Sequence, residues 1–296
     1  MERRDVAIVG AGPAGLAAAL RLRELGVRDV VLLEREGEAG GVPRHCGHLG
    51  FGWQSHCRLW RGPAFAARLR REAEGLDLRT ATTVLALEGD GLLRLQDRQG
   101  LSTLAARQVL VATGTRETPR AARLIGGTRP PGVMNTGALQ QHVYLRGHRP
   151  FARPVIVGSE WVAFSAILTC RHLGIQPVAL LEATARSSAP WPGGLVARCL
   201  YNVPLLTRTR LLAIEGRGQV EAVVVERRGR ERRIACDGVI LSGGFVPEDA
   251  LLRDALRRGA PPPRLAGNVQ GRLKTSGLCW REGRAAAEAI ARTLGA

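Results

Sequence analysis

The sequence predicts an α/β fold that contains two strand–helix–strand units with parallel strands. An apolar run at residues 5–9 leads into a glycine-rich turn and an Ala- and Leu-rich stretch that reaches Leu25, which is the pattern of a buried strand followed by a helix. A second apolar run, residues 30–33, ends at Glu34 and completes the first unit. The same plan recurs at residues 154–182, with an apolar run, a glycine, a helix-like stretch and an apolar run that ends at Glu182.

The spacing of the two units indicates a duplicated architecture. Gly10 and Glu34 are 24 residues apart, and so are Gly158 and Glu182. Equal spacing favours duplication, although convergence on one loop geometry gives the same pattern. Segments 79–96 and 211–237 alternate enough to be sheet. We therefore predict two Rossmann-like dinucleotide-binding domains, the second inserted in the first, with residues 1–118 and 243–296 in one and residues 119–242 in the other.

The charge of the chain is strongly positive but evenly spread. The 296 residues carry a formal net charge of +17, which raises nucleic acid as a partner. However, arginine is distributed along the whole chain, Lys274 is the only lysine, and aromatic residues make up 4%, which leaves few platforms for base stacking. The densest basic run, residues 227–233, lies between two β-like stretches and is interpreted as a solvated hairpin tip. We expect no nucleic-acid partner.

Other bulk features suggest a cytoplasmic protein. No apolar run approaches the roughly 20 residues that span a membrane, and the first residues lead directly into a strand pattern instead of a signal peptide. The six cysteines are scattered without a C-x-x-C pair, so we expect them to be reduced. We therefore expect cytoplasmic localisation and no transmembrane segment.

The first glycine turn has the pattern of a dinucleotide site. Gly10 permits a tight turn, Gly12 lets a pyrophosphate approach the backbone, and Gly15 lets the helix pack against the strand. The helix N-terminus adds N–H donors and a positive dipole end for the phosphate. Glu34 stands at the distance that reaches a ribose 2′-hydroxyl.

Later motifs give the sequence a family resemblance. These are Gly40-Gly41, Val109-Leu-Val-Ala-Thr-Gly114, Val239-Ile-Leu-Ser-Gly-Gly-Phe-Val-Pro247 and Ala266-Gly-Asn268. With the first turn, they make the chain resemble the pyridine-nucleotide-disulfide oxidoreductase superfamily. The resemblance implies FAD as cofactor and the FAD/NAD(P)-binding, thioredoxin-reductase-like form of the fold.

The resemblance also implies which residues hold the flavin. In that superfamily the strand ending in Thr-Gly lies near the flavin nucleotide, and the last motif usually reads Ala-x-Gly-Asp, with an Asp that contacts the ribityl chain. Asn268 replaces that Asp here, and its amide can still donate and accept hydrogen bonds. The segment from Thr275 to Leu294 is the expected helix whose N-terminus faces the flavin pyrimidine ring. The complete set of predicted cofactor-binding residues is Gly10, Ala11, Gly12, Pro13, Ala14, Gly15, Glu34, Arg35, Gly41, Val42, Arg44, Val84, Ala112, Thr113, Gly114, Asn268 and Thr275.

A narrower resemblance rests on residues 40–52 and 131–141. These look like signatures of the A-type subunits of opine oxidases, hydrogen cyanide synthase and heteromeric proline or hydroxyproline dehydrogenases. The resemblance implies a second flavoprotein subunit that oxidises the amine, and an iron–sulfur subunit or segment as an onward route for electrons. Members of that group often carry a C-terminal cysteine-rich iron–sulfur segment, and this sequence contains no such cluster of cysteines.

The cysteine and histidine pattern bears on the chemistry. Thiol–disulfide exchange requires two sulfurs within bonding reach, and neither domain has two closely spaced cysteines, so dithiol catalysis is not expected. His45 and Cys46 are the candidates for a catalytic role. The spacing of His45, Cys46, His48, His56 and Cys57 fits no familiar zinc pattern, and we predict no metal site. Arg44 is expected beside the flavin phosphate or ring edge, and a bland loop is the alternative.

The second glycine turn departs from a functional fingerprint. Glu160 stands where backbone must touch the pyrophosphate, and a carboxylate there adds bulk and repels phosphates. NAD(P)H binding is therefore predicted to be weak or absent. If a nicotinamide dinucleotide does bind, Glu182 favours NAD over NADP, because its charge would repel a 2′-phosphate.

Three functions remain open from the sequence. The preferred hypothesis is an FAD-dependent oxidoreductase that serves as the electron-transfer subunit of a heteromeric amine or amino-acid dehydrogenase, of the opine, proline or hydroxyproline type. One alternative is a self-sufficient NAD(P)H-dependent flavin oxidoreductase, which NADH would reduce directly. The other is a non-catalytic nucleotide-binding scaffold subunit.

Overall fold

The computed structural model describes residues 1–189, 199 and 201–295, and these divide into two compact units. Unit 1 comprises residues 1–44, 49–116 and 246–296, and unit 2 comprises residues 45–48 and 117–245. The sequence placed the boundaries at 118/119 and 242/243, whereas the structure divides the chain at 116/117 and 245/246. It also assigns residues 45–48 to unit 2, which sequence separation gave no reason to expect.

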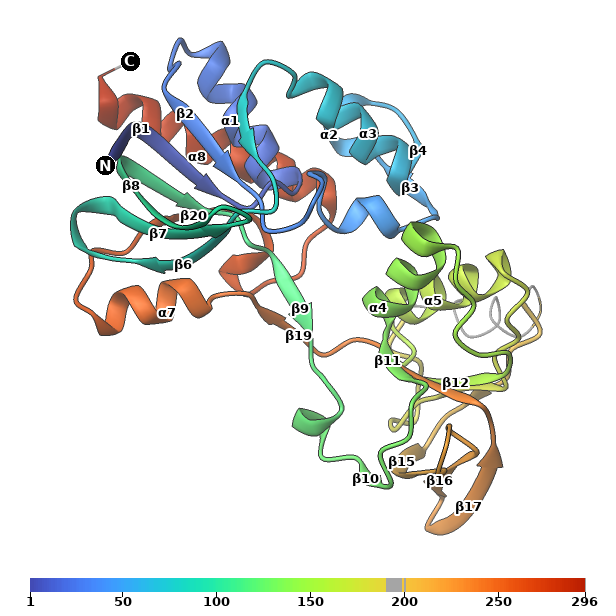
Figure 1. Cartoon of the computed structure of the whole chain (residues 1–296). Helices are drawn as coiled ribbons and strands as arrows, with labels where there is room; N and C mark the ends of the chain where they lie inside the picture. The colour runs from blue at the N-terminus through green and yellow to red at the C-terminus, as the bar shows by residue number, and fades with distance from the viewer. Residues whose placement is uncertain (190–198, 200, 296) are drawn as a thin grey trace. The chain divides into compact units, whose positions relative to one another are not determined.

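Unit 1 is built on a sheet with strand order β5-β2-β1-β8-β7-β6, and β20 also pairs with β8 (Figure 1). The pairs β1–β2, β1–β8, β2–β5 and β8–β20 are parallel, and the pairs β6–β7 and β7–β8 are antiparallel. The strands of this sheet are β1 (Glu2–Val9), β2 (Val30–Leu33), β5 (Asp77–Arg79), β6 (Thr83–Leu87), β7 (Leu92–Asp97), β8 (Gly100–Val111) and β20 (Arg264–Leu265). A separate antiparallel pair in unit 1 consists of β3 (Leu49–Phe51) and β4 (Trp60–Arg61).

Both faces of the unit 1 sheet are buried at β1 and β2, which explains the apolar runs of these two strands. Val6 and Ile8 pack with α1 (Pro13–Glu24) and α8 (Ser276–Leu294) on one face, and Ala7 and Val9 belong to a separate core on the other face. Figure 1 shows α1 and α8 running beside each other on the sheet. A Cβ at Gly283 of α8 would lie 2.0 Å from the carbonyl oxygen of Ala14, so this close helix contact requires glycine. The other α-helices that the structure describes in this unit are α2 (Trp53–His56), α3 (Gly62–Glu72) and α7 (Ala250–Arg257).

Unit 2 contains a five-stranded parallel sheet with the order β11-β18-β12-β13-β14. Its strands are β11 (Val133–Asn135), β12 (Pro154–Val157), β13 (Ala179–Leu181), β14 (Leu205–Leu206) and β18 (Gly238–Leu241). The strands β12 and β13 flank α5 (Trp161–His172), as the repeat predicts. A second helical stretch consists of α4 (Thr136–Gln140) and the π-helix η4 (Gln141–Leu145).

The basic run of the sequence is part of a separate four-stranded sheet in unit 2, with the order β10-β15-β16-β17. The strands are β10 (Gly126–Gly127), β15 (Thr209–Glu215), β16 (Ala222–Arg227) and β17 (Arg230–Ala235). The predicted hairpin tip lies at Arg228 and Gly229, which both have positive φ angles. Two short strands, β9 (Thr115–Glu117) and β19 (Phe245–Pro247), pair where the chain passes between the units.

Candidate functional site

The glycine turn of unit 1 lies at the carboxyl ends of two parallel strands. Val9 of β1 is opposite Val111 of β8, and the amide of Ala112 donates to the carbonyl oxygen of Val9 at 2.8 Å. Gly10 has a φ of +102°, and a Cβ there would lie 2.6 Å from the carbonyl oxygen of Ala112. Only glycine tolerates both this positive φ angle and so close an approach of the Ala112 carbonyl oxygen. Gly10 therefore lets the turn lie directly against the Ala112–Gly114 motif.

The other two fingerprint glycines serve different purposes. A Cβ at Gly15 would lie 1.9 Å from the carbonyl oxygen of Gly10, so Gly15 lets α1 pack tightly on the turn. Gly12, in contrast, has open space at its Cβ position, where the nearest atom is the Cα of Gly41 at 3.9 Å. Gly12 and Gly41 therefore form a cradle in which a ligand can reach the backbone.

The N-terminus of α1 suits an anion. Pro13 occupies the first turn, no side chain caps the helix end, and the first turn holds no acidic residue. The amide of Leu16 donates back to the carbonyl oxygen of Gly12 at 3.0 Å, which fixes the turn. The backbone N–H groups of Ala14 and Gly15 precede the first helical hydrogen bond, and with the helix dipole they favour a phosphate at this end.

The predicted ribose contact, Glu34, is buried at the end of β2. Its Oε2 accepts a hydrogen bond from the amide of Ala11 at 2.8 Å, and its Oε1 accepts one from the amide of Glu36 at 2.9 Å. An ionised carboxylate offers about four acceptor positions, so two remain for sugar hydroxyls. Arg35, the next residue, has a largely exposed side chain whose Nε lies 3.9 Å from Glu36.

The segment that precedes Val84 adjoins the end of β2. The amide of Thr82 donates to the carbonyl oxygen of Glu34 at 2.9 Å, and the amide of Ala81 donates to the carbonyl oxygen of Glu36 at 2.8 Å. Val84 itself lies in β6 and packs partly buried against the apolar core. Just after β8, Thr113 donates to the carbonyl oxygen of Glu248 at 2.7 Å, so its hydroxyl and the adjacent Gly114 hold the chain that follows β19.

Asn268 binds the loop that leads into α8. Its Oδ1 accepts from the amide of Lys274 at 2.7 Å, and its Nδ2 donates to the carbonyl oxygen of the same residue at 3.3 Å. Thr275 is the N-cap of α8, where its Oγ1 accepts from the amide of Leu278 at 3.4 Å. The Asn268 side chain therefore holds the loop before the N-terminus of α8 through both its amide oxygen and its amide nitrogen.

Three residues that sequence reasoning missed support this helix end. The carboxylate of Glu282 accepts from the amide of Gly267 at 3.0 Å and forms an ion pair with Lys274. Gln54 of α2 accepts a hydrogen bond from the hydroxyl of Thr275. No local motif identifies Gln54, because Gln54 and Thr275 are 221 positions apart in the chain.

Segment 42–46 contains the remaining predicted residues. Val42 is largely exposed, whereas the Arg44 side chain is mostly buried, with its Nε 3.5 Å from a carboxylate oxygen of Glu38. His45 and Cys46 are buried and belong to unit 2. The thiol of Cys46 donates to Oε1 of Gln140 at 3.3 Å, and burial raises the pKa of this thiol to about 12. A thiolate nucleophile at Cys46 is therefore unfavourable at neutral pH.

The described part of the chain contains no group of three or more His, Cys, Asp or Glu side chains placed to hold a metal ion. Within the same residues, no helix combines the length and the apolar character that crossing a membrane requires. All six cysteines are free thiols.

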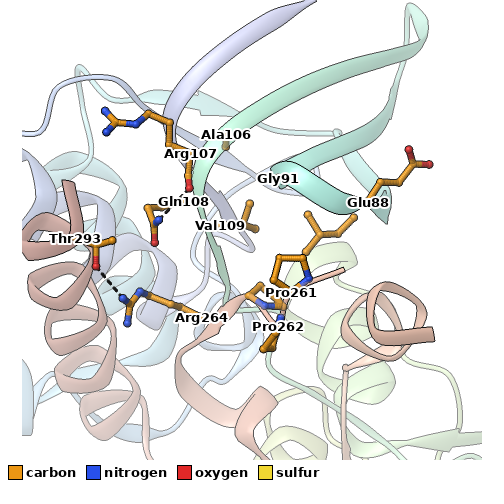
Figure 2. Close-up of a pocket in the computed structure, with 12 residues that line it drawn as sticks. Glu88, Gly91, Ala106, Arg107, Gln108, Val109, Pro261, Pro262, Arg264 and Thr293 are labelled. Carbon is orange, nitrogen blue, oxygen red and sulfur yellow. Dashed lines mark hydrogen bonds between the residues drawn. The ribbon is translucent and has the colours of Figure 1, made fainter. Parts of the chain in front are cut away.

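A cavity of about 410 Å³ lies elsewhere in unit 1 (Figure 2). Residues 106–109 of β8 form one side, residues 261–264 form another, and Arg264 donates to the hydroxyl of Thr293 at 3.0 Å. None of the residues lining this cavity belongs to the glycine turn or to the α8 N-terminus. Ligands of open parallel sheets bind beyond the carboxyl ends of the strands, and the Gly12 cradle, unlike this cavity, lies at such a strand end.

Comparison with known proteins agrees with this geometry. A profile of the pyridine nucleotide-disulphide oxidoreductase family matches residues 4–260. The chain belongs to this family. As a member of the pyridine nucleotide-disulphide oxidoreductase family, it has the nucleotide-binding Rossmann fold that the sequence predicted.

The curated relatives are components of larger enzymes. The alpha subunit of sarcosine oxidase from Rhizobium meliloti (strain 1021) is 27% identical over 98% of this chain and 31% of that protein. The A-type subunit of opine oxidase from the same strain is 27% identical over 69% of this chain and 42% of that protein. The HcnB subunit of hydrogen cyanide synthase from Pseudomonas aeruginosa is 31% identical over 62% of this chain and 39% of that protein. This chain thus spans less than half the length of each of these relatives.

Solved structures confirm the fold. Thioredoxin reductase of T. acidophilum superposes with a TM-score of 0.81 at 21% identity and covers all of both chains. L-proline dehydrogenase of P. horikoshii gives a TM-score of 0.73 at 20% identity, over 99% of this chain and 56% of that chain. The predicted thioredoxin-reductase-like fold is therefore confirmed.

Proposed function

We propose that this chain binds FAD in unit 1 and is the electron-transfer subunit of a heteromeric amine or amino-acid dehydrogenase. The observation that carries the proposal is the open cradle at Gly12, which adjoins an uncapped helix N-terminus and a buried carboxylate with spare acceptor capacity. A dinucleotide needs all three features, because its pyrophosphate must approach the backbone while its ribose donates to an acid.

The residues present fit FAD. The Gly12 cradle and the first turn of α1 would hold the pyrophosphate, and Glu34 would accept from a ribose hydroxyl. Asn268 and Thr275 would fix the N-terminus of α8, whose positive end favours negative charge on a bound group. When bound, FAD supplies the two-electron redox chemistry, and the protein contributes binding, orientation and electrostatics.

Two observations favour an electron-transfer component over a self-sufficient reductase. The relatives named above are themselves described as subunits of sarcosine oxidase, opine oxidase and hydrogen cyanide synthase. In addition, no C-x-x-C pair is present to receive electrons as a dithiol, and the Cys46 thiol is protonated at neutral pH. Electrons would therefore enter from a partner flavoprotein that oxidises the amine, and an iron–sulfur subunit could carry them onward.

Anaerobic titration of the flavin-loaded protein tests the proposal. We expect micromolar NADH to leave the flavin absorbance unchanged and dithionite to bleach it fully and reversibly. Prompt bleaching by NADH would instead establish a self-sufficient NAD(P)H-dependent reductase. A purified protein that holds a nucleotide but shows no reversible flavin reduction would establish a scaffold role.

A further inference from the structure

The two glycine turns of the chain can be compared position by position. Gly10 and Gly158 both end a buried strand and have φ angles of +102° and +118°. In unit 1 the neighbouring strand pairs at Val9 and Val111, and in unit 2 it pairs at Val157 and Leu241. Each helix begins three residues after its turn glycine, at Pro13 and at Trp161. Glu160 therefore occupies the position in unit 2 that Gly12 occupies in unit 1.

The side chain of Glu160 folds back over its own turn. The hydroxyl of Ser242, which follows β18, donates a hydrogen bond to Oε1 of Glu160. A Cβ at Gly158 would lie 2.7 Å from Oε2, and a Cβ at Gly243 would lie 3.0 Å from Oε1. The carboxylate thus lies against the backbone of both strand ends, whereas the equivalent space at Gly12 is open.

Arg123 holds in place the segment that binds this carboxylate. Its guanidinium donates to the carbonyl oxygens of Ser242, at 3.0 Å, and of Gly243. Burial lowers the pKa of Arg123, and the nearby charges of Glu117 and Glu160 act in the opposite direction. The positive charge and the Ser242 hydroxyl therefore both favour the folded-back position of Glu160.

The predicted ribose acid of unit 2 is also engaged by protein groups. Glu182 accepts from the hydroxyls of Ser159 and Ser188, the latter at 3.0 Å. It further accepts from the amide of Thr184 at 2.9 Å. The Thr184 hydroxyl lies 2.8 Å from Oε1 of Glu182 and 2.7 Å from the carbonyl oxygen of Arg186, and it can donate its single hydrogen to only one of them. Glu182 therefore has at least three protein donors for roughly four acceptor positions, so at most one is left for a sugar.

Residues 187–189 cover the turn itself. The amide of Ser188 donates to the Ser159 hydroxyl at 2.8 Å, and the amide of Ala189 donates to the Ser159 carbonyl oxygen at 2.9 Å. Ser159 is fully buried as a result, with 0% of its surface exposed.

We infer that unit 2 is closed to nicotinamide dinucleotides by its own side chains, with the Glu160 carboxylate as the closing group. Glu160 fills the place where pyrophosphate would contact the turn, and its negative charge would repel the phosphates. The residues present therefore do not fit NAD(P), although the fold is of the kind that binds it.

Binding of NADH alone, measured by its fluorescence and by calorimetry, tests the inference without any flavin reaction. The wild-type protein should show no saturable binding at NADH concentrations up to about 1 mM. Glu160→Gly should bind NADH at least about tenfold more tightly than the wild type, because it restores the backbone approach seen at Gly12. Glu160→Gln, which removes the charge but keeps the bulk, should gain less than Glu160→Gly.

A matched control is Glu231→Gln, which removes one exposed negative charge from the same unit and should bind NADH no better than the wild type. Unchanged circular dichroism would establish that Glu160→Gly is folded, as expected because glycine is tolerated at a helix N-cap. Wild-type binding at micromolar NADH would overturn the inference. So would a folded Glu160→Gly protein that still fails to bind. Flavin content and dithionite reduction, which test the proposed function, are read separately from these titrations.

Discussion

The hydroxyl of Ser159 donates a hydrogen bond to Oε2 of Glu182. The equivalent bond in unit 1 comes from the backbone amide of Ala11 to Oε2 of Glu34, at 2.8 Å. Both units thus tie the acid at the end of the second strand to the glycine turn. The difference is the number of protein donors, since Glu34 accepts from two amides while Glu182 accepts from at least three donor groups. Glu34 keeps two acceptor positions for a ligand, whereas at most one position of Glu182 remains.

Gly12→Glu should convert the first turn into a copy of the second. We expect it to reduce the bound FAD per protein chain to near zero, because a carboxylate in the cradle would exclude the pyrophosphate. The fold should survive, since only the Cα of Gly41 lies near the Gly12 Cβ position, at 3.9 Å, and unit 2 accommodates glutamate at the equivalent position. The ratio of flavin absorbance to protein absorbance measures this loss. Gly37→Glu, at a glycine with open surroundings, is the control and should retain full flavin.

Asn268→Ala should loosen the N-terminus of α8. It removes both hydrogen bonds to Lys274, which are partly buried, and each contributes about 1 kcal/mol, so we expect a loss of about 1–3 kcal/mol in the free energy of unfolding. Flavin occupancy should fall with it. Asn268→Asp keeps the acceptor for the Lys274 amide and should retain most of the flavin. Equal flavin content in Asn268→Ala and the wild type would show that this loop does not contribute to the cofactor site.

The two cysteines of segment 46–57 should differ in reactivity. Cys46 is 6% exposed, and burial raises its pKa to about 12, whereas Cys57 is exposed. Because the thiolate is the reacting form, iodoacetamide at neutral pH should modify Cys57 at least about 100-fold faster than Cys46. Mass spectrometry of peptides from a time course gives both rates, and Cys57→Ser confirms the assignment. Comparable rates would revive Cys46 as a candidate nucleophile.

The stability of unit 1 should depend on Glu2 in acid. The hydrogen bond from Arg79 holds the pKa of Glu2 at about 2, below its ordinary value of 4.5. Stabilisation by a carboxylate with a lowered pKa is complete above the unfolded value and disappears as the pH falls through the folded value. The difference in unfolding free energy between wild type and Glu2→Gln should therefore be constant above about pH 5 and shrink between about pH 4.5 and 2. Because Glu2 is partly exposed, we expect a difference of about 1 kcal/mol or less, measured by urea unfolding at each pH.

The sequence predicted much of this architecture because its signals are local. The apolar runs of residues 5–9 and 154–157 and the spacing from Gly10 to Glu34 depend on contacts within a single strand–helix–strand unit. The roles of Gly10 and Gly15 follow from backbone geometry that any such turn imposes. Glu160 could be identified for the same reason, because it is a bulky acid at a position where the local fingerprint requires glycine.

Other features depended on partners distant in the chain. Sequence could not indicate that Gln54 meets Thr275 or that residues 45–48 belong with unit 2. Nor could it show that Ser242 binds the side chain of Glu160 or that Arg123 binds the carbonyl oxygen of Ser242. These two contacts span 82 and 119 positions.

The amino-acid sequence by itself determined the α/β class, the duplicated unit and the glycine turn for a dinucleotide, since short-range sterics and apolar periodicity specify them. Only the tertiary structure decided which turn is open and which is closed. A carboxylate beside a turn can point to solvent or fold back, and the outcome depends on whether distant segments supply its donors. For Glu160 they do, and the second turn is filled by the protein itself.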